Sequence, residues 1–202
     1  MLLDIVKRLR QELGDTFPIS VKLNSADFQR GGFDEDDAVF VIRELAKLNI
    51  DLLEISGGTY ENIKFLTERY QRESTRQREA YFMDFADKIR KLTDLPLMIT
   101  GGFRSLAFCE EVIQNKELDM IGFARPFLVE KDFPKQFLSD PDNRVPDAVF
   151  DFKIPQMKDF AEAGFYDYQI HRLAAGQELQ PGYSPYLAVL RLTSNEMRKG
   201  WF

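Results

Sequence analysis

Hydrophobic residues recur along the first part of the chain in two alternating patterns. The first has the spacing of one face of a helix and consists of Leu2, Val6, Leu9 and Leu13. Gly14 follows where such a helix would end. Residues 18–24 then alternate between apolar and polar side chains, with Lys22 on the polar face. The chain therefore opens with an amphipathic helix followed by a strand that has one apolar face.

The same succession of helix and strand is repeated three more times. Three further helices are predicted from apolar stripes at Ala38, Val41, Ile42, Leu45 and Leu48, at Phe82, Phe85, Ala86, Ile89 and Leu92, and at Leu106, Cys109, Val112 and Ile113. Asp34 and Ser105 are suited to cap two of them. Strands are predicted over residues 50–56, 97–100 and 119–123. Residues 59–77 are polar and form either a helix-containing excursion or a mobile loop. This alternation predicts an α/β fold with a parallel sheet, either open or closed into a (β/α)8 barrel.

The character of the chain changes after these repeats. Residues 139–143 (SDPDN) form a turn-rich linker. Beyond it, residues 155–175 and 186–198 have largely helical patterns. We therefore predict two domains, a barrel portion over residues 1–138 and a helical C-terminal extension over residues 139–202.

Composition narrows the possible partners and metal sites. The 202 residues carry a net charge of −6, which argues against nucleic acid, because phosphate backbones attract basic surfaces. The single cysteine, Cys109, and the single histidine, His171, cannot form a disulfide framework or a multi-histidine metal site. No apolar run approaches the roughly 20 residues of a membrane span. We expect a soluble, cytoplasmic protein without membrane contacts.

Two strand ends carry residues suited to bind a phosphate. After the strand at 97–100 come Gly101 and Gly102, and glycines at such a turn let an anion approach backbone N–H groups. The strand at 119–123 runs through Gly122 into Ala124 and Arg125, whose guanidinium matches two phosphate oxygens. In (β/α)8 barrels, phosphate often binds after the last two strands. A purely structural role for the glycine turn remains the alternative.

Five stretches in this order resemble motifs of the old yellow enzyme family, the NADH:flavin oxidoreductases. They are residues 21–28 (VKLNSADF), 54–61 (EISGGTYE), 78–82 (REAYF), 100–104 (TGGFR) and 122–127 (GFARPF). The resemblance extends over about residues 1–138. It implies a (β/α)8 TIM barrel of which this chain covers about the last four βα units, a half barrel with a helical tail.

The resemblance also implies a cofactor and a reaction. Members of the family bind FMN and pass a hydride from NAD(P)H through the flavin to an activated alkene. Carried over by motif, Lys22 would lie near the pyrimidine edge of the flavin, where a cation stabilises the reduced ring. Backbone N–H groups of Gly101 and Gly102, and the Gly122–Arg125 segment with Ala124 and Arg125, would hold the phosphate. Phe103 and Phe123 would either flank the flavin or pack in the core. A solvated or salt-bridged strand lysine is the alternative for Lys22, and a surface arginine is the alternative for Arg125.

The resemblance leaves the catalytic competence of this chain open. In a complete member the first four strands supply the His/Asn or His/His pair that holds the substrate, and the resemblance implies that this chain lacks that pair. We therefore assign no catalytic residue. The chain is expected to be part of an oxidoreductase that pairs with a second copy or with an N-terminal half. A non-catalytic half barrel that binds FMN, phosphate or a partner subunit is the alternative. A phosphate-binding aldolase or epimerase, with Lys22 forming a Schiff base, is a third possibility.

Overall fold

The computed structural model describes residues 1–27, 30–56, 83–146, 148 and 157–198. They group into two compact units, Met1–Phe123 and Ala124–Phe202. The expected excursion at residues 59–77 lies outside the described residues. None of the described helices is long and apolar enough to cross a membrane.

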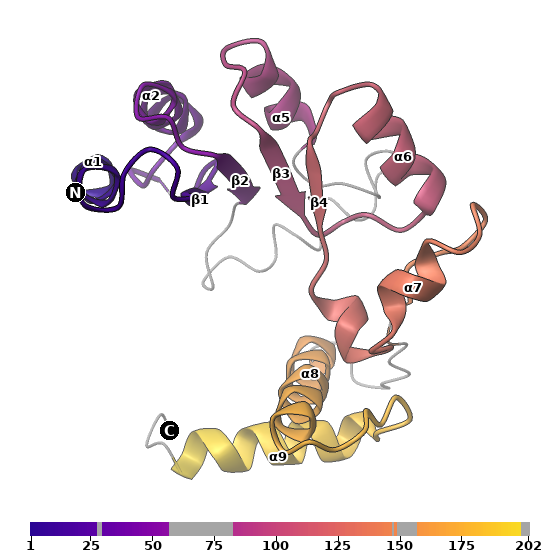
Figure 1. Ribbon diagram of the computed structural model, residues 1–202. Helices are drawn as coiled ribbons and strands as arrows, with labels where there is room; N and C mark the ends of the chain where they lie inside the picture. Colours follow the sequence, from indigo (N-terminus) through magenta and orange to yellow (C-terminus); the bar gives the residue numbers. More distant parts are fainter. Residues whose placement is uncertain (28–29, 57–82, 147, 149–156, 199–202) are drawn as a thin grey trace. The chain divides into compact units, whose positions relative to one another are not determined.

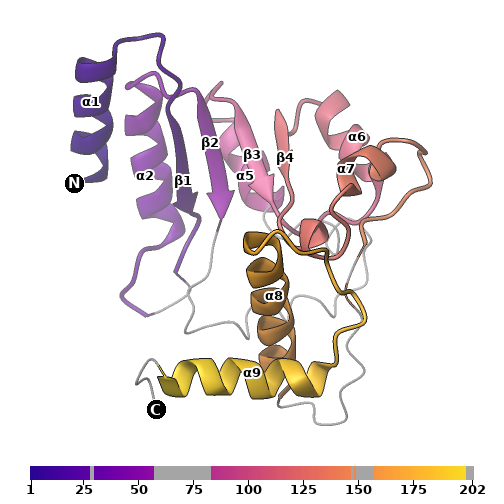
Figure 2. The ribbon, with the colours of Figure 1, turned by 60° about the horizontal axis from the view of Figure 1, so that its bottom comes forward.

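The first unit contains a four-stranded parallel sheet in the order β1-β2-β3-β4. The strands are β1 (Ser20–Asn24), β2 (Leu52–Ser56), β3 (Leu97–Thr100) and β4 (Met120–Gly122). Figure 2 shows them side by side, pointing the same way. Sequential, parallel strands joined through helices form part of a (β/α)8 barrel, as the alternation of patterns predicts.

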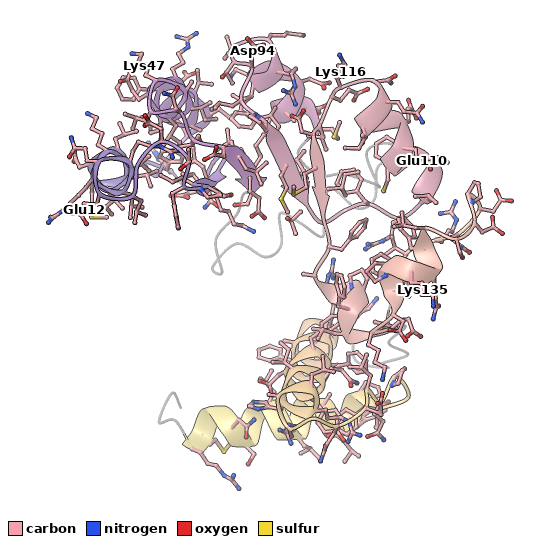
Figure 3. All side chains as sticks on the ribbon, in the orientation of Figure 1. Glu12, Lys47, Asp94, Glu110, Lys116 and Lys135 are labelled. Atoms are coloured by element: carbon pink, nitrogen blue, oxygen red, sulfur yellow. The ribbon has the colours of Figure 1, made fainter. Side chains whose placement is uncertain are left out.

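Four helices cover the apolar face of this sheet. They are α1 (Leu2–Leu13), α2 (Glu35–Ala46), α5 (Met83–Arg90) and α6 (Leu106–Gln114), and Figure 1 shows them around its outer side. Charged side chains such as Glu12 and Lys47 point away from the sheet (Figure 3). Asp34 caps α2 as predicted, since its carboxylate accepts the Asp37 N–H while the Asp37 carboxylate accepts the Asp34 N–H.

The two faces of the sheet differ sharply in chemistry. The face toward the helices is buried and holds Val21, Leu53, Ile55, Leu97 and Ile99. The strand register places Lys22, Glu54, Met98 and Met120 in one row across the opposite face. Because side chains alternate along a strand, the apolar core and a partly charged face belong to the same four strands.

Some positions in the predicted apolar stripes are solvent-exposed. Leu9, Leu13 and Ile113 each expose more than a third of their surface, so the prediction that Ile113 lies on the buried side of its helix was wrong. In α6 the side that faces inward is set by Leu106, Cys109 and Val112, and Ile113 lies at the edge of that stripe. Ser105 occupies the predicted N-cap position, but its side chain makes no capping hydrogen bond.

The same arginine–aspartate arrangement stabilises the sheet at two places. Asp51, just before β2, accepts the Ile19 N–H at 2.8 Å and is paired with Arg10 of α1 at 3.0 Å. Asp119, just before β4, accepts the Leu97 N–H at 2.8 Å and pairs with Arg90 of α5 at 2.5 Å. In both cases the carboxylate links the start of one strand to the neighbouring strand and to the helix that precedes that neighbouring strand.

These contacts predict a loss of stability in acid. The Ile19 N–H and Arg10 lower the pKa of Asp51. Burial raises the pKa of Asp119, but the Leu97 N–H and Arg90 outweigh it and lower that pKa overall. The folded chain therefore binds these protons more weakly than the unfolded chain. The stabilisation is present above the unfolded pKa of about 4 and disappears as the pH falls through the lowered folded pKa.

Urea unfolding between neutral pH and pH about 3 measures this effect, because the range crosses the unfolded aspartate pKa. We expect Asp119→Asn to be less stable at neutral pH by about 1 kcal/mol, a figure that allows for solvent screening, and to lose less stability in acid. A variant whose acid profile parallels that of the parent protein would contradict this role for Asp119.

The second unit consists mainly of helices. They are the 3-10 helix η2 (Arg125–Leu128), α7 (Phe133–Phe137), α8 (Lys158–Ala174) and α9 (Pro185–Arg198). Helices α8 and α9 pack against each other and cross (Figure 2). The connection between them is fixed by Gln169, which is fully buried: its Nε2 donates to the Gln180 carbonyl at 2.7 Å and its Oε1 accepts the Gln180 N–H at 2.9 Å.

The units divide between Phe123 and Ala124, earlier in the chain than the linker at residues 139–143. The reason lies in packing within the second unit. Leu128 and Val129 contact the buried cluster of Phe165, Tyr166 and Ala188. The segment after β4 is thereby attached to α8 and α9, and the domain boundary after residue 138 stays a prediction.

Candidate functional site

The polar face of the sheet is organised around an ion pair between neighbouring strands. Lys22 of β1 and Glu54 of β2 are register partners, and Lys22 Nζ lies 2.6 Å from Glu54 Oε1. The side chain of Lys22 is 54% exposed, whereas that of Glu54 is 17% exposed. A lysine that emerges from a sheet face beside a shielded carboxylate is held in place yet accessible to an anionic ligand.

Glu54 is ionised at neutral pH. Burial raises the pKa of Glu54, but hydrogen bonding from Lys22 and Thr100, together with the charge of Lys22, lowers it overall. The Thr100 hydroxyl is itself buried and makes no hydrogen bond of standard geometry among the described residues. The Thr100 hydroxyl therefore lies beside the Glu54 carboxylate on this face.

Polar side chains continue beyond this pair at the carboxyl ends of β1 and β2. Ser56 Oγ donates to Asn24 Oδ1 at 2.9 Å, and Asn24 Nδ2 donates to Asp27 Oδ1 at 3.3 Å. In open and closed parallel α/β folds, ligands bind at this end of the strands. The location of these groups agrees with a ligand site on the polar face.

The glycine turn after β3 has the backbone conformation expected of it. Gly101 and Gly102 have φ angles of 95° and 88°, which disfavour other residues. A Cβ at Gly101 would meet no atom within 4 Å, so the turn requires glycine there for its conformation rather than for space.

One of the two predicted phosphate donors is already engaged. The Gly101 N–H donates to the Gly122 carbonyl at 3.1 Å and continues the pairing of β3 with β4. Among the described residues, the N–H groups of Gly102 and Phe103 have no backbone acceptor. These two groups are therefore better suited than Gly101 to receive an anion.

Phe103 and Gly122 contribute to packing. The Phe103 ring is 1% exposed, stacks on Phe108 with centroids 5.9 Å apart and meets the edge of Phe123 at 6.4 Å. This burial agrees with a core role for the Phe103 ring, one of the two alternatives for it beside a position against the flavin. A Cβ at Gly122 would overlap the side chain of Thr100, its register partner, so glycine leaves room for the Thr100 side chain.

Ala124 and Arg125 belong to the second unit. Ala124 precedes η2, and Arg125 is its first residue. Arg125 Nη1 donates to Oε1 of Glu162 on α8 at 2.6 Å, and the two side chains are 42% and 30% exposed. The sequence indicates the arginine but gives no signal for Glu162, which lies 37 residues further along the chain.

Comparison with known proteins identifies the family of the chain. The fold places it among (β/α)8 barrel proteins, and the model of the NADH:flavin oxidoreductase / NADH oxidase family matches residues 1–141. The chain belongs to this family. Membership confirms the resemblance of the five motifs to old yellow enzymes and decides against an aldolase or epimerase.

Individual relatives show how much of a family member the chain represents. It is 35% identical over 154 residues to the NADH-dependent flavin oxidoreductase iliE of Hypocrea jecorina, covering 73% of this chain and 38% of that protein. It is 33% identical over 131 residues to the NADH-dependent flavin oxidoreductase nadA of Aspergillus parasiticus, covering 64% and 29%. The old yellow enzyme homologue from Zymomonas mobilis has the same fold, with a TM-score of 0.50 and 18% identity over 83% of this chain and 42% of that one. The chain thus spans well under half the length of these relatives.

Family membership implies FMN as cofactor and NAD(P)H as hydride donor. The residues present fit two parts of FMN. The positive-φ glycine turn suits a phosphate, and the exposed ammonium of Lys22, held beside Glu54, suits the polar edge of a flavin ring.

Proposed function

We propose that this chain forms the FMN-binding half of an oxidoreductase that reduces an activated alkene. The observation that carries the proposal is the combination, in one family member, of the Lys22 cation on the polar sheet face with the glycine turn after β3. Bound FMN would supply the redox chemistry by taking a hydride from NAD(P)H and delivering it to the alkene.

Each residue has a distinct part in this proposal. Lys22 would favour negative charge on the reduced flavin. The N–H groups of Gly102 and Phe103, with the Arg125 guanidinium, would bind the phosphate. Gly101 and Gly122 would shape the backbone that presents these donors, and Ala124 would contribute its backbone ahead of Arg125. Among the described residues, no cluster of three or more His, Cys, Asp or Glu side chains is suited to bind a metal.

Catalysis needs more than these residues, and we propose that it depends on further strands. Within the described sheet, β1 and β4 are edge strands with unpaired backbone groups, and one sheet face carries exposed Met120 and Lys22. Either a second copy of the chain or a separate N-terminal half would pair with these edges. Light scattering of the purified chain distinguishes the two possibilities, because a dimer of the chain has a mass of about twice the 23.5 kDa of one chain.

A non-catalytic half barrel that binds FMN or phosphate is the second candidate function. It requires only the cofactor site, with the Lys22 cation and the glycine turn after β3, and no catalytic residue. The two candidates share the cofactor site and differ in turnover. Oxidation of NAD(P)H that depends on an enone, by the chain alone, would exclude the second candidate.

Arg125→Ala tests the phosphate contact in both candidates. We expect FMN to bind about tenfold to a hundredfold more weakly, because a charge-assisted hydrogen bond contributes roughly 1.5–3 kcal/mol. Riboflavin, which lacks the phosphate, should bind as it does to the parent chain. Titration of both ligands, followed by quenching of flavin fluorescence, measures the two dissociation constants.

The matched control is Lys131→Ala, which removes another ion-paired cation of the second unit, the partner of Glu178. It should leave both affinities unchanged. An equal loss for FMN and riboflavin in Arg125→Ala, or a large fall in its Tm, would show that Arg125 acts through folding instead of through the phosphate.

A further inference from the structure

The arginine of the proposed phosphate contact is held by a residue of the C-terminal helices. Arg125 Nη1 lies 2.6 Å from Oε1 of Glu162, and the carboxylate is 30% exposed. A short, charge-assisted hydrogen bond of this kind fixes the direction of a side chain as well as contributing energy. The guanidinium therefore has a preferred orientation set by α8.

The backbone that carries Arg125 rests on the same helix. Leu128 and Val129 pack against Phe165 and Tyr166, which lie three and four residues after Glu162 and so on the same side of α8. One face of α8 thus holds both the η2 backbone, through apolar contacts, and the Arg125 side chain, through the ion pair.

Helix α8 is in turn firmly fixed within its unit. Gly164 allows the α9 backbone to approach closely at Ala188, and Gln169 pairs with both backbone groups of Gln180 in the connection to α9. A guanidinium attached to such a base loses little freedom when it binds a ligand, whereas an unrestrained arginine would lose much of its rotamer entropy.

We propose that Glu162 is a positioning residue for FMN binding, because it orients the Arg125 guanidinium. This inference rests on the proposed function, in which Arg125 binds the phosphate. Arginine has five N–H donors in a rigid fork, and the contact with Glu162 Oε1 is made by Nη1. The negative charge of the Glu162 carboxylate repels a phosphate. Glu162 can therefore favour FMN binding only by orienting the Arg125 guanidinium.

Three substitutions separate orientation from charge. Glu162→Ala removes the acceptor, Glu162→Asp keeps the charge but withdraws it by one methylene, and Glu162→Gln keeps an acceptor of the same length without the charge. We expect FMN to bind about threefold to tenfold more weakly to the Ala and Asp variants, because the guanidinium regains rotamer freedom. The Gln variant should bind FMN at least as tightly as the parent chain. Riboflavin affinity should be the same in all four proteins.

Glu178→Ala is the matched control, since Glu178 belongs to the same unit and pairs with Lys131 at 2.7 Å. It should change neither affinity. If Glu162→Ala unfolds, the opposite expected effects of the Asp and Gln variants still decide the question.

The outcomes distinguish this inference from the proposed function. A parent chain that binds FMN no better than riboflavin overturns the phosphate site, and the inference with it. A second outcome is that the parent chain prefers FMN to riboflavin but the Ala and Asp variants bind FMN as tightly as the parent or more tightly. This outcome overturns the inference alone, because Glu162 would then compete with the phosphate for Arg125. A parallel loss of FMN and riboflavin affinity also overturns it, because that is the effect of a merely structural residue.

Discussion

Replacing Gly164 with valine is expected to destabilise the C-terminal helical unit strongly. A Cβ at this position would lie within van der Waals overlap of the Ala188 backbone carbonyl on α9, and a backbone cannot yield as a flexible side chain does. Overpacking of this kind costs about 1–3 kcal/mol and occasionally more, and we expect the upper end or beyond for valine. Urea unfolding gives the loss of stability, and hydrogen exchange of α8 and α9 locates it.

A second glycine of the same unit provides the control. Gly182 has no atom within 4 Å of an added Cβ and an ordinary φ angle. Gly182→Ala should therefore shift the free energy of unfolding by no more than about 0.5 kcal/mol. Equal stability of Gly164→Val and Gly182→Ala would show that α8 and α9 do not approach each other as closely as described.

Truncating Phe103 to alanine is expected to have a comparably large effect on the first unit. The ring is 1% exposed and packs on Phe108 and Phe123, so its removal leaves a cavity behind the glycine turn. Buried phenylalanine-to-alanine changes cost about 3–5 kcal/mol. Chemical denaturation of the variant measures the loss.

Phe40→Ala is the control, because Phe40 of α2 is 62% exposed. Phe40→Ala should lower the free energy of unfolding only slightly. Phe103→Leu, which keeps most of the volume, should retain FMN binding if the ring serves the core. Loss of FMN with stability preserved in Phe103→Leu would instead assign the ring to the flavin.

The fold was predictable from the sequence because its signals are local. The alternation of stripes predicted β3 at residues 97–100, where it is observed, and placed β2 and β4 to within two residues. Asp34 was predictable as a cap for the same reason, since its partner Asp37 is three residues away. Exposure was harder to predict, as Ile113 shows, because it depends on how neighbouring helices cover the sheet.

The site was predictable only in part. Lys22, the glycine pair and Arg125 stand in motifs, and the pairing of Lys22 with Glu54 follows once adjacent strands are set in register. Two features of the site depend on contacts between distant segments. They are the hydrogen bond from the Gly101 N–H to the Gly122 carbonyl and the ion pair of Arg125 with Glu162. No spacing in the sequence carries that information.

The contacts of Arg125 also explain why the tail matters to the proposed function. The sequence suggests a helical extension beyond a linker at residues 139–143. In the structure, the segment that begins at Ala124 packs with α8 and α9, and the apolar cluster of Phe165, Tyr166 and Ala188 joins them. The extension therefore supports one of the residues proposed to bind FMN.

The visible absorption spectrum of the purified chain, after addition of FMN and removal of free flavin by desalting, tests the central claim most directly. The proposed function predicts that flavin absorption bands remain with the protein, in a ratio near one FMN per chain, and that riboflavin treated in the same way is retained less. A colourless protein, or equal retention of FMN and riboflavin, would contradict the proposal that this chain carries the FMN phosphate site.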